Sequence, residues 1–125
     1  MSHKARVGVL CIDCQTEDLT EATKYWSAML GMEGTIDERG KYAIFDGHKG
    51  YPRVILQAVD HEPRVHLDFE TDDLEAECER LKALGAKEVA RIRTWIVMEA
   101  PTGHRFCLVR PQGADWPGEA KEFNG

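Results

Sequence analysis

An internal repeat restricts the possible folds of this chain more than any other feature of the sequence. The stretch VLCIDCQTEDLTEATKYWSAMLG (9–31) resembles RVHLDFETDDLEAECERLKALG (64–85). Each stretch starts with alternating apolar and polar residues, continues through an acidic segment into an amphipathic pattern, and ends in Leu-Gly. Strict alternation predicts a strand, and apolar residues three and four positions apart predict a helix. The repeat therefore predicts two copies of a strand followed by a helix.

Apolar runs with strand character follow each predicted helix. A poorly defined strand at 32–37, KYAIFDG (41–47) and RVILQAV (53–59) follow the first helix, and KEVARIR (87–93), TWIVMEA (94–100) and HRFCLVR (104–110) follow the second. Each half is thus a βαβββ module. At this length we expect one α+β domain over residues 1–125, with module 1 at about 5–60 and module 2 at about 63–110. The turn-rich segment 111–125 is expected to be a loosely packed tail, with Trp116 as a candidate anchor.

The helix ends carry their own signals. Asp18 or Asp72 can accept hydrogen bonds from the free amides of a first helical turn, with Glu21 or Glu75 three residues later. Gly31 and Gly85 are placed to end the helices in a left-handed conformation.

The repeat also predicts which side chains share a face of the sheet. An offset of 55 residues aligns Cys11 with His66 and Asp13 with Asp68. The apolar row Val65, Leu67 and Phe69 should then be covered by a helix, and the polar row should lie on the opposite, concave face. Two related sheets often pack around a shared interior, so this polar face is expected at a cleft.

Charge and cysteine content exclude several classes of function. The chain has 22 acidic and 16 basic residues, and its net charge of -6 disfavours nucleic acid and anionic membranes as partners. No apolar stretch approaches the roughly 20 residues of a membrane span, and we expect a cytoplasmic protein. The four cysteines are expected to be free thiols, and Cys11 and Cys14 to point to opposite faces of one strand.

The combination of TEDLTEATKYWSAMLGM, RVHLDFETDDLEAECERLKALGA and WIVMEAPTGHRFCLV resembles the vicinal oxygen chelate superfamily, which includes glyoxalase I, extradiol dioxygenases and bleomycin-resistance proteins. The resemblance covers roughly residues 6–110 and is greatest to the small glyoxalase-like domain proteins. It implies two βαβββ modules in a cupped mixed sheet with the helices outside, often in a homodimer. Four inward side chains hold the metal in the enzymes of this superfamily, and the corresponding positions are Cys11, Gln57, His66 and Cys107.

This set lacks the glutamates of the superfamily's metal sites. Carboxylates suit Mg, Mn, Ni or Fe, whereas two cysteines with one histidine suit Zn, with Gln57 or water as the fourth ligand. The same residues are also compatible with a pocket that holds no metal. The sequence therefore leaves two alternatives, no cofactor or a divalent ion. Zn is favoured if an ion binds.

Each candidate also has a structural interpretation. His66 can be a polar strand residue that faces solvent or is held by Asp68, and Cys11 and Cys107 can be small core residues. Gln57 can be an ordinary polar strand residue, and His61 and His104 are expected at the surface. Glu99 is the nearest spare carboxylate, although a solvated turn residue is the simpler interpretation.

These observations favour a glyoxalase-like protein that binds a small molecule between its two modules. We expect seven residues to line the pocket: Cys11, Asp13, Gln57, His66, Asp68, Trp95 and Cys107. The alternative is a metal-dependent lyase, isomerase or dioxygenase acting on a substrate with vicinal oxygens, in which Glu99 or Asp68 would move a proton.

Overall fold

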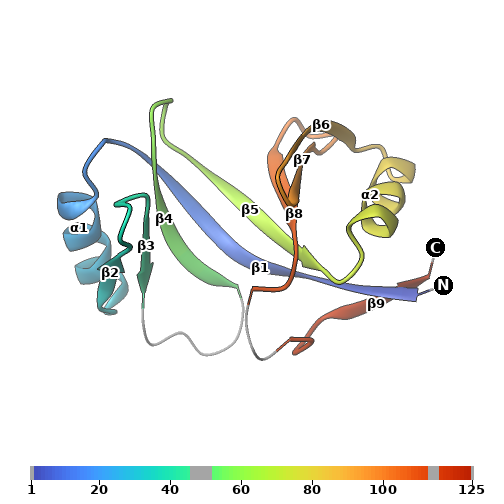
Figure 1. The fold of residues 1–125 in the computed structure, drawn as a ribbon, viewed down its shortest axis with the longest axis horizontal. Coiled ribbons are helices and arrows are strands. Elements are labelled where there is room, and N and C mark those ends of the chain that lie inside the picture. Colours follow the sequence, from blue (N-terminus) through green and yellow to red (C-terminus); the bar gives the residue numbers. More distant parts are fainter. Residues whose placement is uncertain (1, 46–51, 113–115, 125) are drawn as a thin grey trace. The chain divides into compact units, whose positions relative to one another are not determined.

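The structure is a computed structural model that describes residues 2–45, 52–112 and 116–124. The chain divides into two compact units (Figure 1). The module-1 unit comprises residues 9–66, and the module-2 unit comprises residues 1–8 and 67–125. Strand β1 (Ser2–Gln15) and strand β5 (Arg64–Thr71) each run through both units.

The module-1 unit has a four-stranded sheet with one helix. Beyond its part of β1 it contains α1 (Thr20–Leu30), β2 (Gly34–Ile36), β3 (Tyr42–Phe45) and β4 (Arg53–Val59). The strand order is β2-β3-β4-β1; β1 and β4 are parallel, and the other pairs are antiparallel. Leu19, Ala43, Phe45 and Leu56 form the buried core, against which Trp26 and Leu30 of α1 pack. The predicted strand, helix and three strands are all present.

The module-2 unit repeats this pattern. After its part of β5 it contains α2 (Leu74–Ala83), β6 (Lys87–Ile92), β7 (Trp95–Glu99) and β8 (Arg105–Val109), in the sheet order β5-β8-β7-β6. Strands β5 and β8 are parallel, as are β1 and β4 in the other unit. Its core is Cys78, Ile96, Met98 and Leu108. The mixed sheet and two helices confirm the predicted α+β class.

The end of the chain differs from the prediction of a loose tail. Residues Lys121–Asn124 form strand β9, which pairs antiparallel with Ser2–Ala5 of β1. Arg6 donates a hydrogen bond from Nη1 to the carbonyl of Gly118 at 2.5 Å, and its guanidinium lies 5.0 Å from the centre of a Trp116 ring. The predicted anchoring by Trp116 is thus present, but the segment that follows is an ordered edge strand.

Helix α2 begins one residue later than predicted. Asp73 is the N-cap and accepts a hydrogen bond from the amide of Ala76 at 3.0 Å. Asp72 instead accepts from the amide of Lys4 at 2.8 Å. In the first helix, Asp18 accepts from the amide of Thr20 at 2.9 Å, and Gly31 ends the helix with a φ of 69° as predicted.

The apolar row at the start of β5 is only partly covered. Phe69 packs against the module-2 core, but Val65 and Leu67 are exposed. Helix α2 packs on β6, β7 and β8. The expectation that a helix covers the whole row is therefore wrong for its first two members.

Among the described residues, no helix has both the length and the apolar character required to cross a membrane.

Candidate functional site

The most unusual polar residue of the module-1 unit is Asp13, because only 2% of it is exposed. It lies on β1 two positions after Cys11, and alternation along the strand places both side chains on one face. The parallel neighbour of Asp13 on β4 is Gln57, whose antiparallel neighbour on β3 is Tyr42. Three adjacent strands thus bring these polar side chains together.

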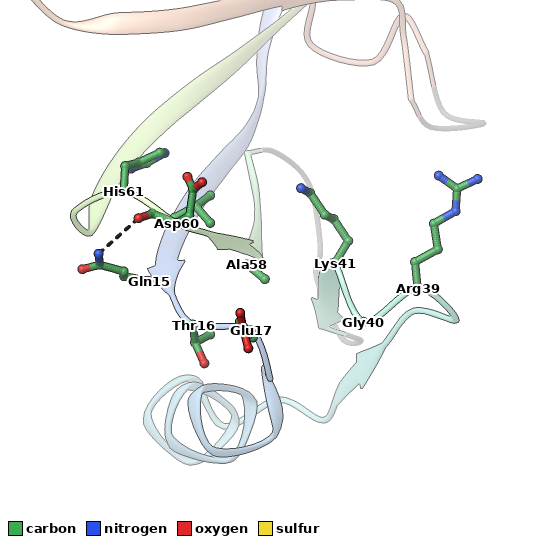
Figure 2. Close-up of a pocket in the computed structure, with 10 residues that line it drawn as sticks. Gln15, Thr16, Glu17, Arg39, Gly40, Lys41, Ala58, Asp60 and His61 are labelled. Atoms are coloured by element: carbon green, nitrogen blue, oxygen red, sulfur yellow. Dashed lines mark hydrogen bonds between the residues drawn. The ribbon is translucent and has the colours of Figure 1, made fainter.

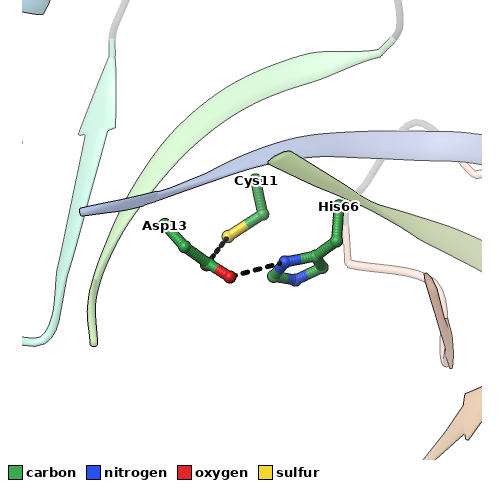
Figure 3. Close-up of side chains that lie close together, drawn as sticks. All are labelled: Cys11, Asp13 and His66. Atoms are coloured by element: carbon green, nitrogen blue, oxygen red, sulfur yellow. Dashed lines mark hydrogen bonds and ion pairs between the residues drawn. The ribbon is translucent and has the colours of Figure 1, made fainter. Parts of the chain in front are cut away.

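A buried carboxylate needs partners, since removing an unpaired charge from water is costly. Asp13 has three nitrogen-bearing neighbours, of which His66 and Arg64 are hydrogen-bond partners. Its Oδ2 lies 3.2 Å from Nδ1 of His66, 3.4 Å from Nε of Arg64 and 3.7 Å from Nε2 of His61. Figure 3 shows His66 and Cys11 directed toward the Asp13 carboxylate from neighbouring strands. We call these residues, with Gln57, the Asp13 centre: Cys11, Asp13, Gln57, His61, Arg64 and His66.

The other side of the centre contains the thiol of Cys11. This thiol lies 3.7 Å from Oδ1 of Asp13 and 3.6 Å from Oε1 of Gln57, and both oxygens are acceptors. The amide nitrogen of Gln57 lies 3.3 Å from the hydroxyl of Tyr42. A continuous polar chain therefore leads from β3 through β4 and β1 to His66 on β5.

Exposure increases across the centre from Asp13 toward solvent. The exposed fraction of the side chain is 2% for Asp13, 15% for His66, 38% for His61 and 56% for Arg64. The carboxylate is thus the buried anchor, and the nitrogen-bearing side chains form its solvent-facing side. A ligand that reaches the centre meets the guanidinium of Arg64 first, because it is the most exposed of these side chains.

The hydrogen bonds of His61 define its tautomer. Its Nδ1 lies 2.8 Å from the carbonyl oxygen of Glu62, which can only accept, so Nδ1 carries the proton. In the neutral ring Nε2 is therefore an acceptor, and it lies 3.2 Å from Nη2 of Arg64, which donates. The guanidinium is thus held by Asp13 at Nε and by His61 at Nη2.

Three residues of the centre are also spaced like metal ligands. One ligand atom each from Cys11, Asp13 and His66 lie within 4.8 Å of one another. Ligand atoms in a tetrahedral zinc site lie roughly 3.3 to 3.8 Å apart, given metal bonds of about 2.0 to 2.3 Å. The observed 3.2 Å between Asp13 and His66 and 3.7 Å between Cys11 and Asp13 are close to this range. The sulfur, oxygen and nitrogen donors fit zinc better than manganese, which prefers oxygen.

Four of the seven residues expected in a pocket belong to the module-1 unit and to the Asp13 centre, namely Cys11, Asp13, Gln57 and His66. Asp68, Trp95 and Cys107 belong to the module-2 unit, where Asp68 and Cys107 are register partners on β5 and β8. The metal set predicted from the resemblance was Cys11, Gln57, His66 and Cys107. Asp13 supplies a carboxylate that this set lacked. The predicted pocket between the modules stays a prediction.

Sequence reasoning did not include Arg64 and His61 in the site. Arg64 lies two residues before His66 on β5, so the same alternation that selected His66 also places Arg64 on that face. His61 was expected at the surface, and only the path of the β4–β5 turn brings it to Asp13. Glu99, a candidate base, forms an ion pair with Arg105 at 2.9 Å.

The thiols of Cys14 and Cys78 do not belong to the Asp13 centre. Burial, and then the Asp13 carboxylate, raise the pKa of the Cys14 thiol. Burial, and then a hydrogen bond to Glu88, raise the pKa of Cys78. All four cysteines are free, as predicted, and these two thiols stay protonated at neutral pH.

A separate pocket of about 680 Å³ lies in the module-1 unit (Figure 2). It is lined by residues 15–17, 39–41 and 58–61. None of the seven predicted pocket residues belongs to this lining. His61 is shared, since it lines the pocket and also lies beside Asp13.

The solved structures that share this fold are described as different kinds of protein. The Mn(II)-bound glyoxalase from Novosphingobium aromaticivorans is 18% identical, with a TM-score of 0.61 over 94% of this chain and 45% of its own. This chain therefore spans less than half the length of that glyoxalase. A protein described as an NAD-dependent benzaldehyde dehydrogenase from Legionella pneumophila is 12% identical, with a TM-score of 0.61 over 82% of this chain and 99% of its own.

A hypothetical protein from Bacillus halodurans is also 12% identical, with a TM-score of 0.59 over 89% of this chain and 99% of its own. At these identities the likeness establishes the fold and not the activity. No curated protein matches the sequence. The family model described as a glyoxalase-like domain matches residues 9–109, which include both modules. This chain therefore belongs to the glyoxalase-like domain family, within the vicinal oxygen chelate superfamily.

Proposed function

We propose that this glyoxalase-like protein binds a small anionic molecule at the Asp13 centre. The observation that supports the proposal is the arrangement of one buried carboxylate behind three nitrogen-bearing side chains of increasing exposure. Asp13 fixes the orientation of His66 and Arg64, and these two side chains are the ones that a ligand would contact.

Arg64 is suited to bind a carboxylate. A guanidinium has five N–H donors, of which Asp13 and His61 use one each. The remaining donors can bind two ligand oxygens side by side, which is the geometry that arginine recognises best. Since Asp13 and His61 already restrict the side chain, less rotamer freedom is lost when a ligand binds.

His66 would supply the second contact. A carboxylate accepts hydrogen bonds, so Asp13 holds the proton of the neutral His66 ring on Nδ1 at 3.2 Å. Nε2 is then an acceptor. A ligand with a carboxylate for Arg64 and a hydroxyl for Nε2 of His66 would be bound at two points.

A metal-dependent activity is the second candidate, and the spacing of Cys11, Asp13 and His66 favours it. These three side chains would hold a zinc ion, which when bound would act as a Lewis acid on a ligand oxygen. The two candidates differ in the role of Asp13. In the first it pairs with Arg64 and His66, and in the second it is a metal ligand.

Metal analysis of protein purified without an affinity tag separates the two candidates. Anion binding alone predicts no stoichiometric metal and no gain in Tm with Zn, Ni, Mn or Fe. The metal-dependent activity predicts one ion per chain that is lost in Asp13→Asn and His66→Ala but kept in His104→Ala, an exposed control.

Calorimetric titration with oxalate and with lactate then tests the proposed contacts in metal-free protein. Arg64→Ala is expected to weaken binding at least tenfold, because two charge-assisted hydrogen bonds are lost. The matched control Arg110→Ala should leave binding unchanged. Equal affinities for the wild type and Arg64→Ala would reject the proposal.

A further inference from the structure

The 680 Å³ pocket lies at the carboxyl ends of the parallel strands β1 and β4. Ligand sites in sheets with parallel strands often lie at this edge. Its volume is within the range of about 300 to 1,000 Å³ typical of small-molecule sites. The two strand ends are tied together, because the amide of Thr16 donates to the carbonyl of Val59 at 3.1 Å and Nε2 of Gln15 donates to the carbonyl of Asp60 at 3.2 Å.

One wall of the pocket is the turn that carries Arg39 and Lys41. Oδ1 of Asp37 accepts hydrogen bonds from the amides of Lys41 at 2.8 Å and Tyr42 at 3.2 Å. The carbonyl of Lys41 accepts from the amide of Ala58 at 2.8 Å, which attaches the turn to β4. The backbone of this wall is therefore fixed before any ligand binds.

The side chains on that wall have no countercharge. Within the described parts of the chain, neither Arg39 nor Lys41 makes a side-chain hydrogen bond or an ion pair. Arg64 of the same unit differs in this respect, since it is held by Asp13. Two cations thus border one pocket, and neither forms an ion pair with a described carboxylate.

The opposite side of the pocket is acidic. Figure 2 shows Arg39 and Lys41 on one side, Asp60 and His61 on the other, and Glu17 between them. Among the described residues, the carboxylates of Glu17 and Asp60 also lack hydrogen bonds and ion pairs. The pocket therefore has positive groups on one side and negative groups on the other. None of these groups is paired with another described side chain.

We propose that this pocket is a second ligand site, which shares His61 with the Asp13 centre and binds a small zwitterion of the amino-acid type. The ligand's carboxylate pairs with Arg39 and Lys41, and its ammonium group pairs with Asp60 and Glu17. A ligand without charged groups would leave all four side chains unpaired, and a simple anion would pair with one wall only.

The test uses three probes of similar size on ¹⁵N-labelled protein: 4-aminobutyrate, butyrate and butylamine. The proposal predicts saturable shifts of the amide signals of residues 15–17, 39–41 and 58–61 with 4-aminobutyrate, at a Kd at least tenfold lower than with either of the other probes. Equal affinity for butyrate, or shifts that do not saturate, would overturn it.

Matched variants separate pairing in the pocket from the effect of net charge. The double variant Arg39→Gln, Lys41→Gln is expected to weaken 4-aminobutyrate binding at least tenfold. The double variant Lys24→Gln, Arg110→Gln removes the same charge from exposed positions outside the pocket and should bind like the wild type. Equal weakening in both variants, or in neither, contradicts the proposal. His66→Ala should leave this binding intact even if the function proposed for the Asp13 centre fails.

Discussion

The buried ion pair of Arg6 and Glu70 gives the sharpest prediction on stability. Glu70 is fully buried; its Oε1 accepts from Nε of Arg6 at 2.8 Å and its Oε2 from the amide of Gln112 at 3.0 Å. The pair joins β1, β5 and the segment after β8. Glu70→Gln preserves the shape of the side chain but removes its charge, so the buried guanidinium of Arg6 loses its charge-assisted hydrogen bond to Glu70.

The expected cost follows from that burial. Removal of one partner of a buried ion pair destabilises a protein by about 3 to 5 kcal/mol. For a chain of this size each kcal/mol corresponds to a Tm change of about 3 to 5 °C, so Tm should fall by roughly 10 to 20 °C. Calorimetry or circular dichroism measures this directly.

The control is Glu99→Gln, which breaks the partly exposed pair with Arg105 at 2.9 Å. Partly exposed pairs contribute about 1 kcal/mol or less, so its Tm should fall by only a few degrees. If Tm falls by the same amount in Glu70→Gln and Glu99→Gln, burial does not determine the strength of these ion pairs, and the prediction is wrong.

Two further predictions concern stability. In Gly8→Ala, the added Cβ would overlap Cδ of Glu70, which its hydrogen bonds hold in place, so thermal unfolding should show a loss of about 1 to 3 kcal/mol. An unchanged Tm would mean that Glu70 moves freely. A hydrogen bond from Arg91 lowers the pKa of Glu88 from 4.5 to about 2. Because the folded pKa is the lower one, the pair stabilises the protein above pH 4.5, and this contribution is lost as the pH falls toward 2. The Tm difference between wild type and Glu88→Gln should therefore shrink over that range, and a constant difference would argue against the pairing.

The repeat was sufficient to predict the two βαβββ modules, because alternation and helical spacing are local properties of the sequence. It also placed Cys11 with Asp13 on one face of β1. The approach of Arg64 and His61 to Asp13 depends on the β4–β5 turn and on which strands are neighbours, and neither is a local property. The pairing of His66 with Asp68 was one of two interpretations, and the structure places Nδ1 of His66 3.2 Å from Oδ2 of Asp13.

The tail was mispredicted for a different reason. KEFN is short and polar, and only its pairing with Ser2–Ala5 makes it a strand. Such pairing between the two ends of a chain leaves no periodic signal in either segment. The expected homodimer stays a prediction that light scattering would test. The exposed apolar side chains of β5 and β6 are candidates for its interface.

The central claim is that Asp13 orients His66 for a ligand. The most direct test is the ¹⁵N signal of the His66 ring in metal-free protein during titration with lactate, which carries both a carboxylate and a hydroxyl. We predict an Nδ1-protonated ring that responds saturably in the wild type and loses both properties in Asp13→Ala. A His66 ring that ignores lactate while other signals shift, or that keeps its tautomer without Asp13, would contradict the claim.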